Sequence, residues 1–348
     1  MIFNEQNQPS TPYKKKQMGK SHSFTLTDFS HSDSMHSSKI NIEEAKENII
    51  VAGNITQPEF LFNGGSFFDC YIGIKHSKDC NFELIVDSLD SDAEIKEKLS
   101  KFICTKEIPN KFRQNFVKFK CLTINKEIKL CINCKDCICI ECLEQCSIET
   151  NGCTPICVLK NKRKIPNDFT STIKKISSVK NHLAKIEYAS LKGSQFTIQM
   201  PFYLLSLEDI LAYANLNNKK LKKELIDKII LHVAKGIQQL NKLNLIHNDI
   251  KPENILFDSI QKEFILCDFN VSQEPGLIKL DGNRKYMAKE VLDDYCCFKS
   301  DVYSLGLLYF EMSQELDDFT KSMMNDRVKN RPSIEDVILY FTKNDNVY

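Results

Sequence analysis

A long amphipathic segment followed at once by closely spaced polar residues constrains the fold of this chain most strongly. Over residues 219–243, apolar side chains recur every three or four positions, which predicts a helix with one buried face. The sequence LIHNDIKPENILF follows directly, and FILCDFN comes a few residues later. The apolar runs Ile255–Phe257 and Phe264–Leu266 predict two short strands joined as a hairpin.

The polar residues of these two stretches are suited to phosphoryl transfer. Asp249 can accept the proton of an attacking hydroxyl, and Lys251 can steady the transferred phosphoryl group. Asn254 and Asp268 offer hard oxygen ligands of the kind that Mg²⁺ prefers, and the predicted hairpin would bring them together. Asp and Asn also populate turns, but turn propensity does not explain so many polar residues at fixed offsets.

Several motifs, in the same order along the chain, resemble those of eukaryotic protein kinases. HNDIKPEN resembles the catalytic loop, and DFN resembles the Asp-Phe-Gly metal motif. YMAKEVL resembles the Ala-Pro-Glu segment, with Glu290 in place, and NRPSIEDVI supplies Arg331, its usual partner. KSDVYSLGLLYFEM resembles the helix whose aspartate, here Asp301, holds the catalytic loop. The resemblance implies an ATP- and Mg²⁺-dependent enzyme that acts on a protein hydroxyl.

The resemblance also implies an α+β, two-lobed fold. A small β-rich lobe with one helix is expected over 126–202 and a larger helical lobe over 203–343, shortened between Gly306 and Arg331. The Ser/Thr-rich residues 1–48 are expected to be a disordered leader because they offer little apolar surface for a core. Residues 49–125 are expected to be an extension of unknown role, with a short helix at 92–104.

The kinase pattern requires a lysine on a strand before the catalytic loop, to contact the nucleotide phosphates. Lys160 ends the apolar strand PICVLKNKR and fits this role. The resemblance places the gatekeeper residue of the ATP pocket near Met200, with Phe202 as a further ATP contact.

Counting back from Lys160 places the glycine-rich loop of the pattern near residues 132–140, where the sequence INCKDCICI contains no glycine. Ile132 and Ile140 are then expected to cover the adenine. The alternation of Cys and Ile from Cys137 to Cys142 has the period of two that a strand pair requires. The earlier stretch NGGSFFDCYIGIK also resembles a phosphate loop, but two adjacent glycines favour an ordinary turn.

The same cysteines allow two other interpretations. Cys131, Cys134 and Cys137 have the spacing of metal ligands, so a metal-binding regulator remains an alternative. A disulfide framework is disfavoured, because the cysteine count of 15 is odd and the start of the chain lacks the apolar core of a secretory signal.

Departures from the kinase pattern raise the alternative of a pseudokinase, a binding module that regulates a partner. The expected loop has no glycines, and DFTSTIKKISSVKN lacks the helix glutamate, with Ser171 or Thr172 near its place.

Asn248 replaces the arginine that usually pairs with a phosphorylated activation loop, and the sole Ser/Thr of this loop is Ser272. Both features predict a loop that needs no activating phosphate.

Other segments resemble the Wee/Myt mitosis-inhibitor kinases. The non-arginine residue Asn248 is typical of that family, and DGNRKYMAKEVL and SLEDILAYANL are similar to two of its segments. This resemblance implies a cyclin-dependent kinase as the substrate and tyrosine as an acceptor.

The net charge of +1 gives no bulk attraction to nucleic acid, and no apolar run is long enough to span a membrane. Because the start of the chain lacks the apolar core of a secretory signal, we expect an intracellular protein of the nucleus or cytoplasm.

Overall fold

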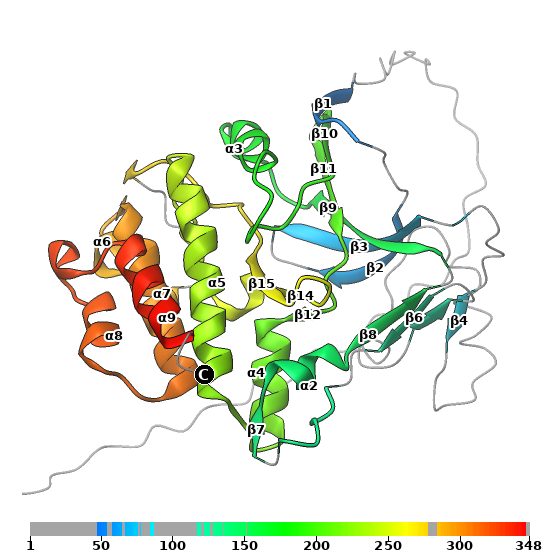
Figure 1. Ribbon diagram of the computed structural model, residues 1–348. Helices are drawn as coiled ribbons and strands as arrows, with labels where there is room; N and C mark the ends of the chain where they lie inside the picture. The colour runs from blue at the N-terminus through cyan, green and yellow to red at the C-terminus, as the bar shows by residue number, and fades with distance from the viewer. Residues whose placement is uncertain are drawn as a thin grey trace, which may run out of the picture. The chain divides into compact units, whose positions relative to one another are not determined.

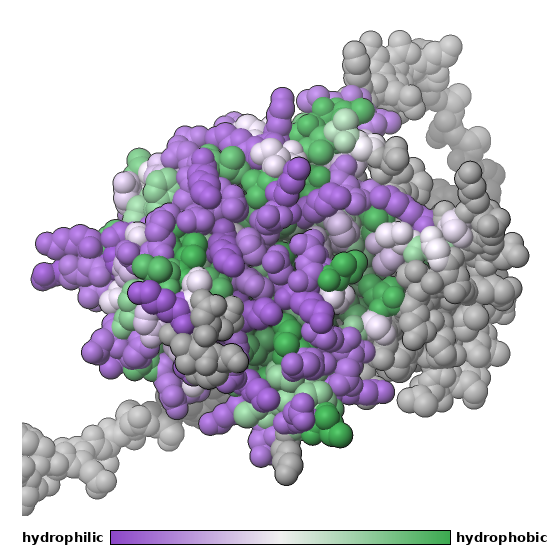
Figure 2. Space-filling model, in the orientation of Figure 1, coloured by the Kyte–Doolittle hydropathy of each residue, from purple (hydrophilic) through white to green (hydrophobic). Residues whose placement is uncertain are grey.

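A computed structural model describes most of the chain beyond residue 46 (Figure 1). The described residues are 47–53, 58–64, 67–75, 77, 84–86, 117–119, 122–125, 128–134, 136–150, 152–277 and 284–345. The leader predicted over 1–48 lies outside them, apart from its last two residues, and so does the helix predicted at 92–104. On the face drawn in Figure 2, hydrophilic residues dominate the described surface and separate small apolar patches.

A six-stranded antiparallel sheet forms the smaller lobe. The strand order is β1-β10-β11-β9-β3-β2, with bounds β1 Glu47–Val51, β2 Pro58–Gly64, β3 Phe68–Lys75, β9 Thr154–Asn161, β10 Tyr188–Lys192 and β11 Gln195–Pro201. Helix α3, Phe169–Ile176, buries residues at positions one, four, five and eight, as expected for one apolar helical face. Its Phe169 ring packs edge-on against Phe196 of β11, at 5.1 Å between centroids.

The predicted start of this lobe at residue 126 is wrong. Strands β1, β2 and β3 all come from the segment predicted as an extension, and β3 pairs directly with β9, in register from Phe68↔Asn161 to Lys75↔Thr154. The hairpin beside the strand of Lys160 is therefore β2–β3. The NGGSFFDCYIGIK stretch, expected to be an ordinary turn, contributes the end of β2 and all of β3.

The strand pair predicted over Cys137–Cys142 is also wrong. Between Cys137 and Cys142 only β7, Cys137–Ile138, is a strand; it pairs in parallel with β13, Lys220–Leu221, and helix α2, Ile140–Glu144, follows. Ile138 and Cys139 are both buried, although they are neighbours in the chain. A half-buried strand would bury every second residue, so the Cys/Ile alternation does not continue as a strand beyond Ile138.

Residues 76–153 are thus an insertion between two neighbouring strands of the small sheet. Part of the insertion forms a second, antiparallel sheet in the order β4-β5-β6-β8. The bounds are β4 Leu84–Val86, β5 Val117–Phe119, β6 Leu122–Asn125 and β8 Ser147–Thr150. Figure 1 shows that α2 leads directly into β8 of this sheet.

Helices dominate the larger lobe, which confirms the predicted α+β fold. Their bounds are α4 Leu207–Leu216, α5 Lys223–Lys242, α6 Lys289–Leu292, α7 Phe298–Ser313, α8 Asp318–Met323 and α9 Ile334–Asp345. The predicted long helix is α5, which packs against α7, α9 and β15. Short strands complete the lobe: β12 Leu205–Ser206, β14 Ile255–Asp258, β15 Glu263–Leu266, β16 Gly276–Leu277 and β17 Tyr295–Cys296. Between α7 and Arg331 lie only the short α8 and one 3₁₀ turn.

Gly236 of α5 allows the helix to approach the segment that joins α3 to β10. A Cβ atom at this position would lie 2.7 Å from the carbonyl oxygen of His182 and 3.1 Å from Leu266 Cδ1. The same segment is fixed by Ala184 N–H donating to the Leu266 carbonyl at 2.7 Å and by Leu266 N–H donating to His182 at 3.0 Å. The His182 backbone, which a Cβ atom at position 236 would contact, is therefore fixed by hydrogen bonds and cannot easily move away.

We expect Gly236→Ala to lower the free energy of unfolding by about 1–3 kcal/mol, because overpacking costs more than the ~1 kcal/mol gained in helix propensity. Urea unfolding followed by circular dichroism measures this. Gln239→Ala, at a partly exposed position of the same helix, serves as control and should change stability by less than about 0.5 kcal/mol. A higher urea midpoint for Gly236→Ala would show that the His182 backbone can move to accommodate the added methyl group at little cost.

Candidate active site

The loop after α5 is anchored from beneath by a buried carboxylate. Asp301 of α7 accepts hydrogen bonds from the backbone N–H groups of His247, at 2.8 Å, and Asn248, at 2.9 Å. Burial raises the pKa of Asp301 to about 6, while these two amides act in the opposite direction. The role predicted for Asp301 is therefore present in the structure.

His247 connects the two halves of the site. Its Nδ1 accepts the backbone N–H of Asp249 at 3.3 Å, so Nε2 carries the proton and donates it to the Cys267 carbonyl at 3.0 Å. Burial lowers the pKa of His247 to about 4, which keeps the ring neutral as this pattern requires. The ring also packs edge-on against Phe269, at 5.6 Å. The fully buried His247 ring thus connects the backbone of Asp249 to the backbone of Cys267, the residue before Asp268.

Asp249, Lys251 and Asn254 form one hydrogen-bonded group. Oδ2 of Asp249 accepts from Lys251 Nζ at 2.7 Å and from Asn254 Nδ2 at 2.8 Å. Asn254 Nδ2 also donates to the Asp249 carbonyl at 2.9 Å. Burial alone would lower the pKa of Lys251, but contact with Asp249 raises it, so the amine stays charged. The predicted base and the predicted phosphoryl-stabilising cation therefore lie side by side.

Asp268 is brought to this group by the β14–β15 hairpin. The strands pair in register Ile255↔Leu266, as predicted, and Cys267 N–H donates to the Asn254 carbonyl at 2.9 Å. Asp268 has a φ of 62°, in the left-handed region, so the backbone leaves the strand conformation at this residue. Burial raises the pKa of Asp268 to about 6, and the nearby charge of Asp249 raises it further, while Lys251 opposes this. Two carboxylates thus share a poorly solvated space.

The residues predicted to hold Mg²⁺ fit that ion. The Asn254 side-chain nitrogen donates both of its hydrogen bonds to Asp249, so the Asn254 Oδ1 atom remains to coordinate a metal ion. The Asp268 carboxylate supplies a second hard ligand, and its raised pKa reflects a site where a bound cation would relieve desolvation and repulsion.

Lys160 lies on β9 between Asp69 of β3 and Thr197 of β11 in the sheet register. Its Nζ sits over the Tyr71 ring, 5.5 Å from the centroid. No carboxylate among the described residues lies within ion-pairing distance of it, and α3 contains no acidic residue, in agreement with the sequence. Sequence reasoning missed Tyr71, whose contact with Lys160 depends on the unexpected β3–β9 pairing.

Of the four residues expected to contact ATP around the adenine, two lie in or beside the sheet of Lys160 and two do not. Met200 is buried near the end of β11, opposite Cys157, and Phe202 is buried just after the strand. Ile132 lies in a turn with 97% of its surface exposed, and Ile140 begins α2. The assignment of these two isoleucines to ATP is therefore wrong, because neither belongs to the sheet that carries Lys160.

The segment after Asp268 is hydrogen-bonded to the catalytic loop. Ile246 and Gln273 exchange two backbone hydrogen bonds, at 2.8 and 3.1 Å. Asn248, which replaces the usual arginine, adopts a φ of 64° and donates from Nδ2 to the Val271 carbonyl at 3.3 Å. The hydroxyl of Ser272 is buried and donates to the His247 carbonyl. These contacts hold the described start of this segment, and that the loop needs no activating phosphate stays a prediction.

Glu290 and Arg331 form a buried bidentate ion pair. Nη1 and Nη2 of Arg331 donate to the two Glu290 oxygens at 2.6 and 2.8 Å, and Ser300 Oγ adds a third bond at 2.8 Å. The Arg331 side chain is 0% exposed. Burial would raise the pKa of Glu290, but these hydrogen bonds lower it. The pair joins α6 to the segment before α9, as the sequence predicted.

An acidic pocket of about 270 Å³ adjoins the catalytic loop. It is lined by Glu208, Leu211, Ala212, Asn215, Glu253, Lys285, Tyr286 and Glu311. Burial raises the pKa of Glu208, and the negative charges of Glu253 and Glu311 raise it further. Sequence reasoning missed this pocket, since its carboxylates come from α4, the catalytic loop and α7 and meet only in the fold.

Comparisons with known proteins agree with this geometry. The protein kinase domain family matches residues 158–329. A probable protein kinase of Dictyostelium discoideum is 32% identical over 140 residues, 38% of this chain and 39% of that protein. A membrane-associated tyrosine- and threonine-specific cdc2-inhibitory kinase of Drosophila melanogaster is 31% identical over 124 residues, 34% of this chain and 22% of that protein.

A third relative is the membrane-associated tyrosine- and threonine-specific cdc2-inhibitory kinase wee-1.3 of Caenorhabditis briggsae. It is 36% identical over 94 residues, 26% of this chain and 14% of that protein. The matched part thus covers well under two thirds of these relatives. Within the described part of this chain, no helix is long and apolar enough to cross a membrane.

Proposed function

We propose, from the premise that this chain is a divergent member of the eukaryotic protein kinase superfamily, that it transfers the γ-phosphate of ATP to a protein hydroxyl. The observation that carries the proposal is the group formed by Asp249, Lys251 and Asn254, with Asp268 close by. A base, a cation and two hard oxygen ligands around one space are the parts that phosphoryl transfer needs.

In this mechanism the Asp249 carboxylate orients the acceptor hydroxyl and takes its proton as the new O–P bond forms. The bond between the γ-phosphorus and the β,γ-bridging oxygen breaks, and ADP leaves with that electron pair. Lys251 stays charged beside the transferred group and offsets its negative charge. Asn254 and Asp268 would hold Mg²⁺, which neutralises phosphate charge when bound. Lys160 would contact the α- and β-phosphates from β9.

The acidic pocket beside the loop favours a substrate with a Lys or Arg side chain near the acceptor. Three carboxylates line it, and Lys285, paired with Glu311 at 2.6 Å, is its sole lining cation. Burial and the negative charges of Glu253 and Glu311 raise the pKa of Glu208, and a basic side chain would offset those charges.

We expect Glu208→Gln to raise KM for a basic peptide about fivefold, which corresponds to about 1 kcal/mol for one partly exposed charge pair, and to leave kcat within about twofold. Steady-state kinetics with a matched peptide whose basic residue is replaced by norleucine provide the control, because KM for that peptide should not respond. An equal rise in KM for both peptides would mean that Glu208 does not recognise the positive charge of the peptide.

The finer proposal is a Wee-like kinase that acts on a cyclin-dependent kinase. Its support is the Wee/Myt resemblance of the segments around Asn248 and DGNRKYMAKEVL, together with the similarity to two cdc2-inhibitory kinases. The test incubates the chain and Mg-ATP with a catalytically inactive cyclin-dependent kinase and analyses the phosphoamino acids. Phosphotyrosine or phosphothreonine is expected. Phosphoserine alone, on generic substrates only, would point to a different kinase class.

A pseudokinase is the second candidate, favoured by the lack of a carboxylate partner for Lys160 among the described residues. The two functions differ in phosphate incorporation by the wild type, Asp249→Asn and Lys160→Met. Activity lost in both variants supports an enzyme. Equal incorporation in all three would assign the signal to a contaminant and leave the chain as a binding module.

A further inference from the structure

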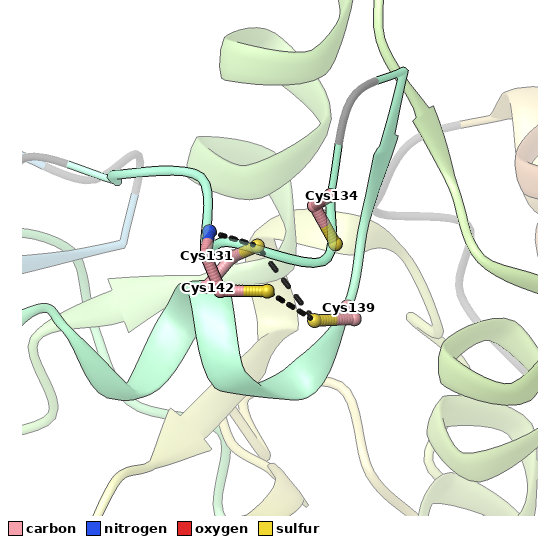
Figure 3. A group of neighbouring side chains, drawn as sticks. All are labelled: Cys131, Cys134, Cys139 and Cys142. Carbon is pink, nitrogen blue, oxygen red and sulfur yellow. Dashed lines mark hydrogen bonds between the residues drawn. The ribbon is translucent and has the colours of Figure 1, made fainter.

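Four cysteine sulfurs of the insertion converge on one point (Figure 3). The Sγ atoms of Cys131, Cys134, Cys139 and Cys142 all lie within 4.8 Å of one another. Two of the separations are 3.5 Å, between Cys131 and Cys139, and 3.7 Å, between Cys139 and Cys142. Four thiolates around one Zn²⁺, with Zn–S bonds of about 2.3 Å in a tetrahedron, lie about 3.8 Å apart. The sulfurs are therefore spaced as ligands of a single ion.

The chain builds this cluster from two short pairs. Cys131 and Cys134 flank a turn closed by a 3.0 Å hydrogen bond from Cys134 N–H to the Cys131 carbonyl, and Cys139 and Cys142 flank the start of α2. All four are free thiols, and three are buried. Cys131 N–H donates to Cys142 Sγ at 3.3 Å, so a hydrogen bond already joins the two pairs. Cys137, which the sequence suggested as a third ligand, lies outside the cluster.

We propose that these four cysteines bind one structural Zn²⁺ ion. The four thiols give up their protons to solvent as four Zn–S bonds form, so no oxidant or reductant is needed. A complete set of four sulfur ligands with no open position is the arrangement of structural rather than catalytic zinc sites. The net charge of −2 would be partly balanced by Lys222, which lies within electrostatic range of Cys134 and Cys139. The exposed Glu141, whose carboxylate contacts the Cys139 sulfur, is free to turn to solvent.

The ion would fasten the insertion to the larger lobe. Between the two cysteine pairs, β7 adds to β13, with Lys220 N–H donating to the Asp136 carbonyl at 3.0 Å and Lys222 N–H donating to Ile138 at 2.9 Å. After the second pair, Glu144 forms a 2.9 Å ion pair with Lys262. Helix α2 has only five residues, so it is too short to be stable without such support.

The same chain then returns through β8 to β9, the strand of Lys160. Zinc bound at this point would therefore restrain the segment that links the larger lobe to the nucleotide-binding sheet. The site is separate from Asp249 and Asp268, and the proposal stands whether or not the chain is an active kinase.

Metal analysis of the purified full-length chain tests the proposal. Plasma mass spectrometry should find about one zinc per wild-type chain and less than about one fifth of that in Cys131→Ser/Cys142→Ser. Cys137→Ser removes a cysteine of the same segment outside the cluster, and Glu141→Gln removes the adjacent carboxylate; both should retain about one zinc. Wild-type protein without zinc, or an equal loss in Cys137→Ser, would overturn the assignment.

A spectroscopic test covers the case in which the double variant fails to fold. The metal-free wild-type chain is titrated with Co²⁺ under reducing conditions. A saturable band of tetrahedral Co²⁺, with thiolate-to-metal charge transfer at one equivalent, is expected, and Zn²⁺ should displace it. Octahedral or unsaturable binding, or a disulfide within the cluster after reducing purification, would contradict the proposal.

Discussion

Asp249→Asn should lower the rate of phosphoryl transfer by about 10²–10⁴-fold and leave ATP affinity within about threefold, the range expected when a general base is lost. The amide of asparagine keeps the shape of the side chain and can still accept from Asn254 Nδ2, which now binds Asp249 at 2.8 Å. It cannot take the proton of the acceptor, and it removes the anion that Lys251 contacts. Single-turnover transfer at saturating Mg-ATP measures the rate, and calorimetric titration measures the affinity.

Asp258→Asn is the matched control for this substitution. Asp258 ends β14 close to the site in sequence, but its carboxylate only accepts the backbone N–H groups of Ile260 and Gln261 in an exposed turn. Its transfer rate should stay within about twofold of wild type. A fall of less than tenfold in Asp249→Asn would mean that proton acceptance by Asp249 does not limit the reaction.

Arg331→Met should lower the free energy of unfolding by about 3–5 kcal/mol, the cost of breaking a buried ion pair from one side. Methionine retains much of the volume, but among the described residues Glu290 is left with the Ser300 hydroxyl as its side-chain hydrogen-bond partner. The guanidinium also donates to the backbone carbonyls of Asn325, at 2.7 Å, and Lys299, at 3.0 Å, and those bonds are lost too. Urea unfolding measures the change.

An exposed ion pair provides the comparison. Lys175 of α3 and Glu274 are 2.9 Å apart, but their side chains are 40% and 60% exposed. Lys175→Met should therefore cost less than about 1 kcal/mol. Equal losses in the two variants would show that burial does not set the strength of the Glu290–Arg331 pair.

The effect of Arg331→Met should also depend on pH. The pKa of Glu290 in the folded wild type lies below its ordinary value of 4.5, so the pair contributes fully above that pH and loses its contribution as pH falls through the folded pKa. The stability difference between wild type and Arg331→Met should thus narrow in acid. A difference that stays constant as the pH falls well below 4.5 would argue against an ionised Glu290.

The catalytic loop and its partners could be predicted from sequence because their geometry is local. Asp249, Lys251 and Asn254 lie within six residues, and a short hairpin with a clear apolar pattern delivers Asp268. The small sheet could not be delimited, because β3 and β9 are neighbours in space with residues 76–153 between them in the chain. Pairing across such an insertion leaves no local pattern. The cysteine segment misled because alternation of Cys and Ile fits both a strand and a ligand cluster.

The most direct test of the central claim is transfer of labelled γ-phosphate from ATP to a degenerate set of peptides by the wild-type chain, with Mg²⁺ and with EDTA, beside Asp268→Asn. Our account predicts peptide label with Mg²⁺, none with EDTA, and at least a hundredfold less in Asp268→Asn. Saturated ATP binding without any peptide label, or equal labelling by wild type and Asp268→Asn, would contradict it.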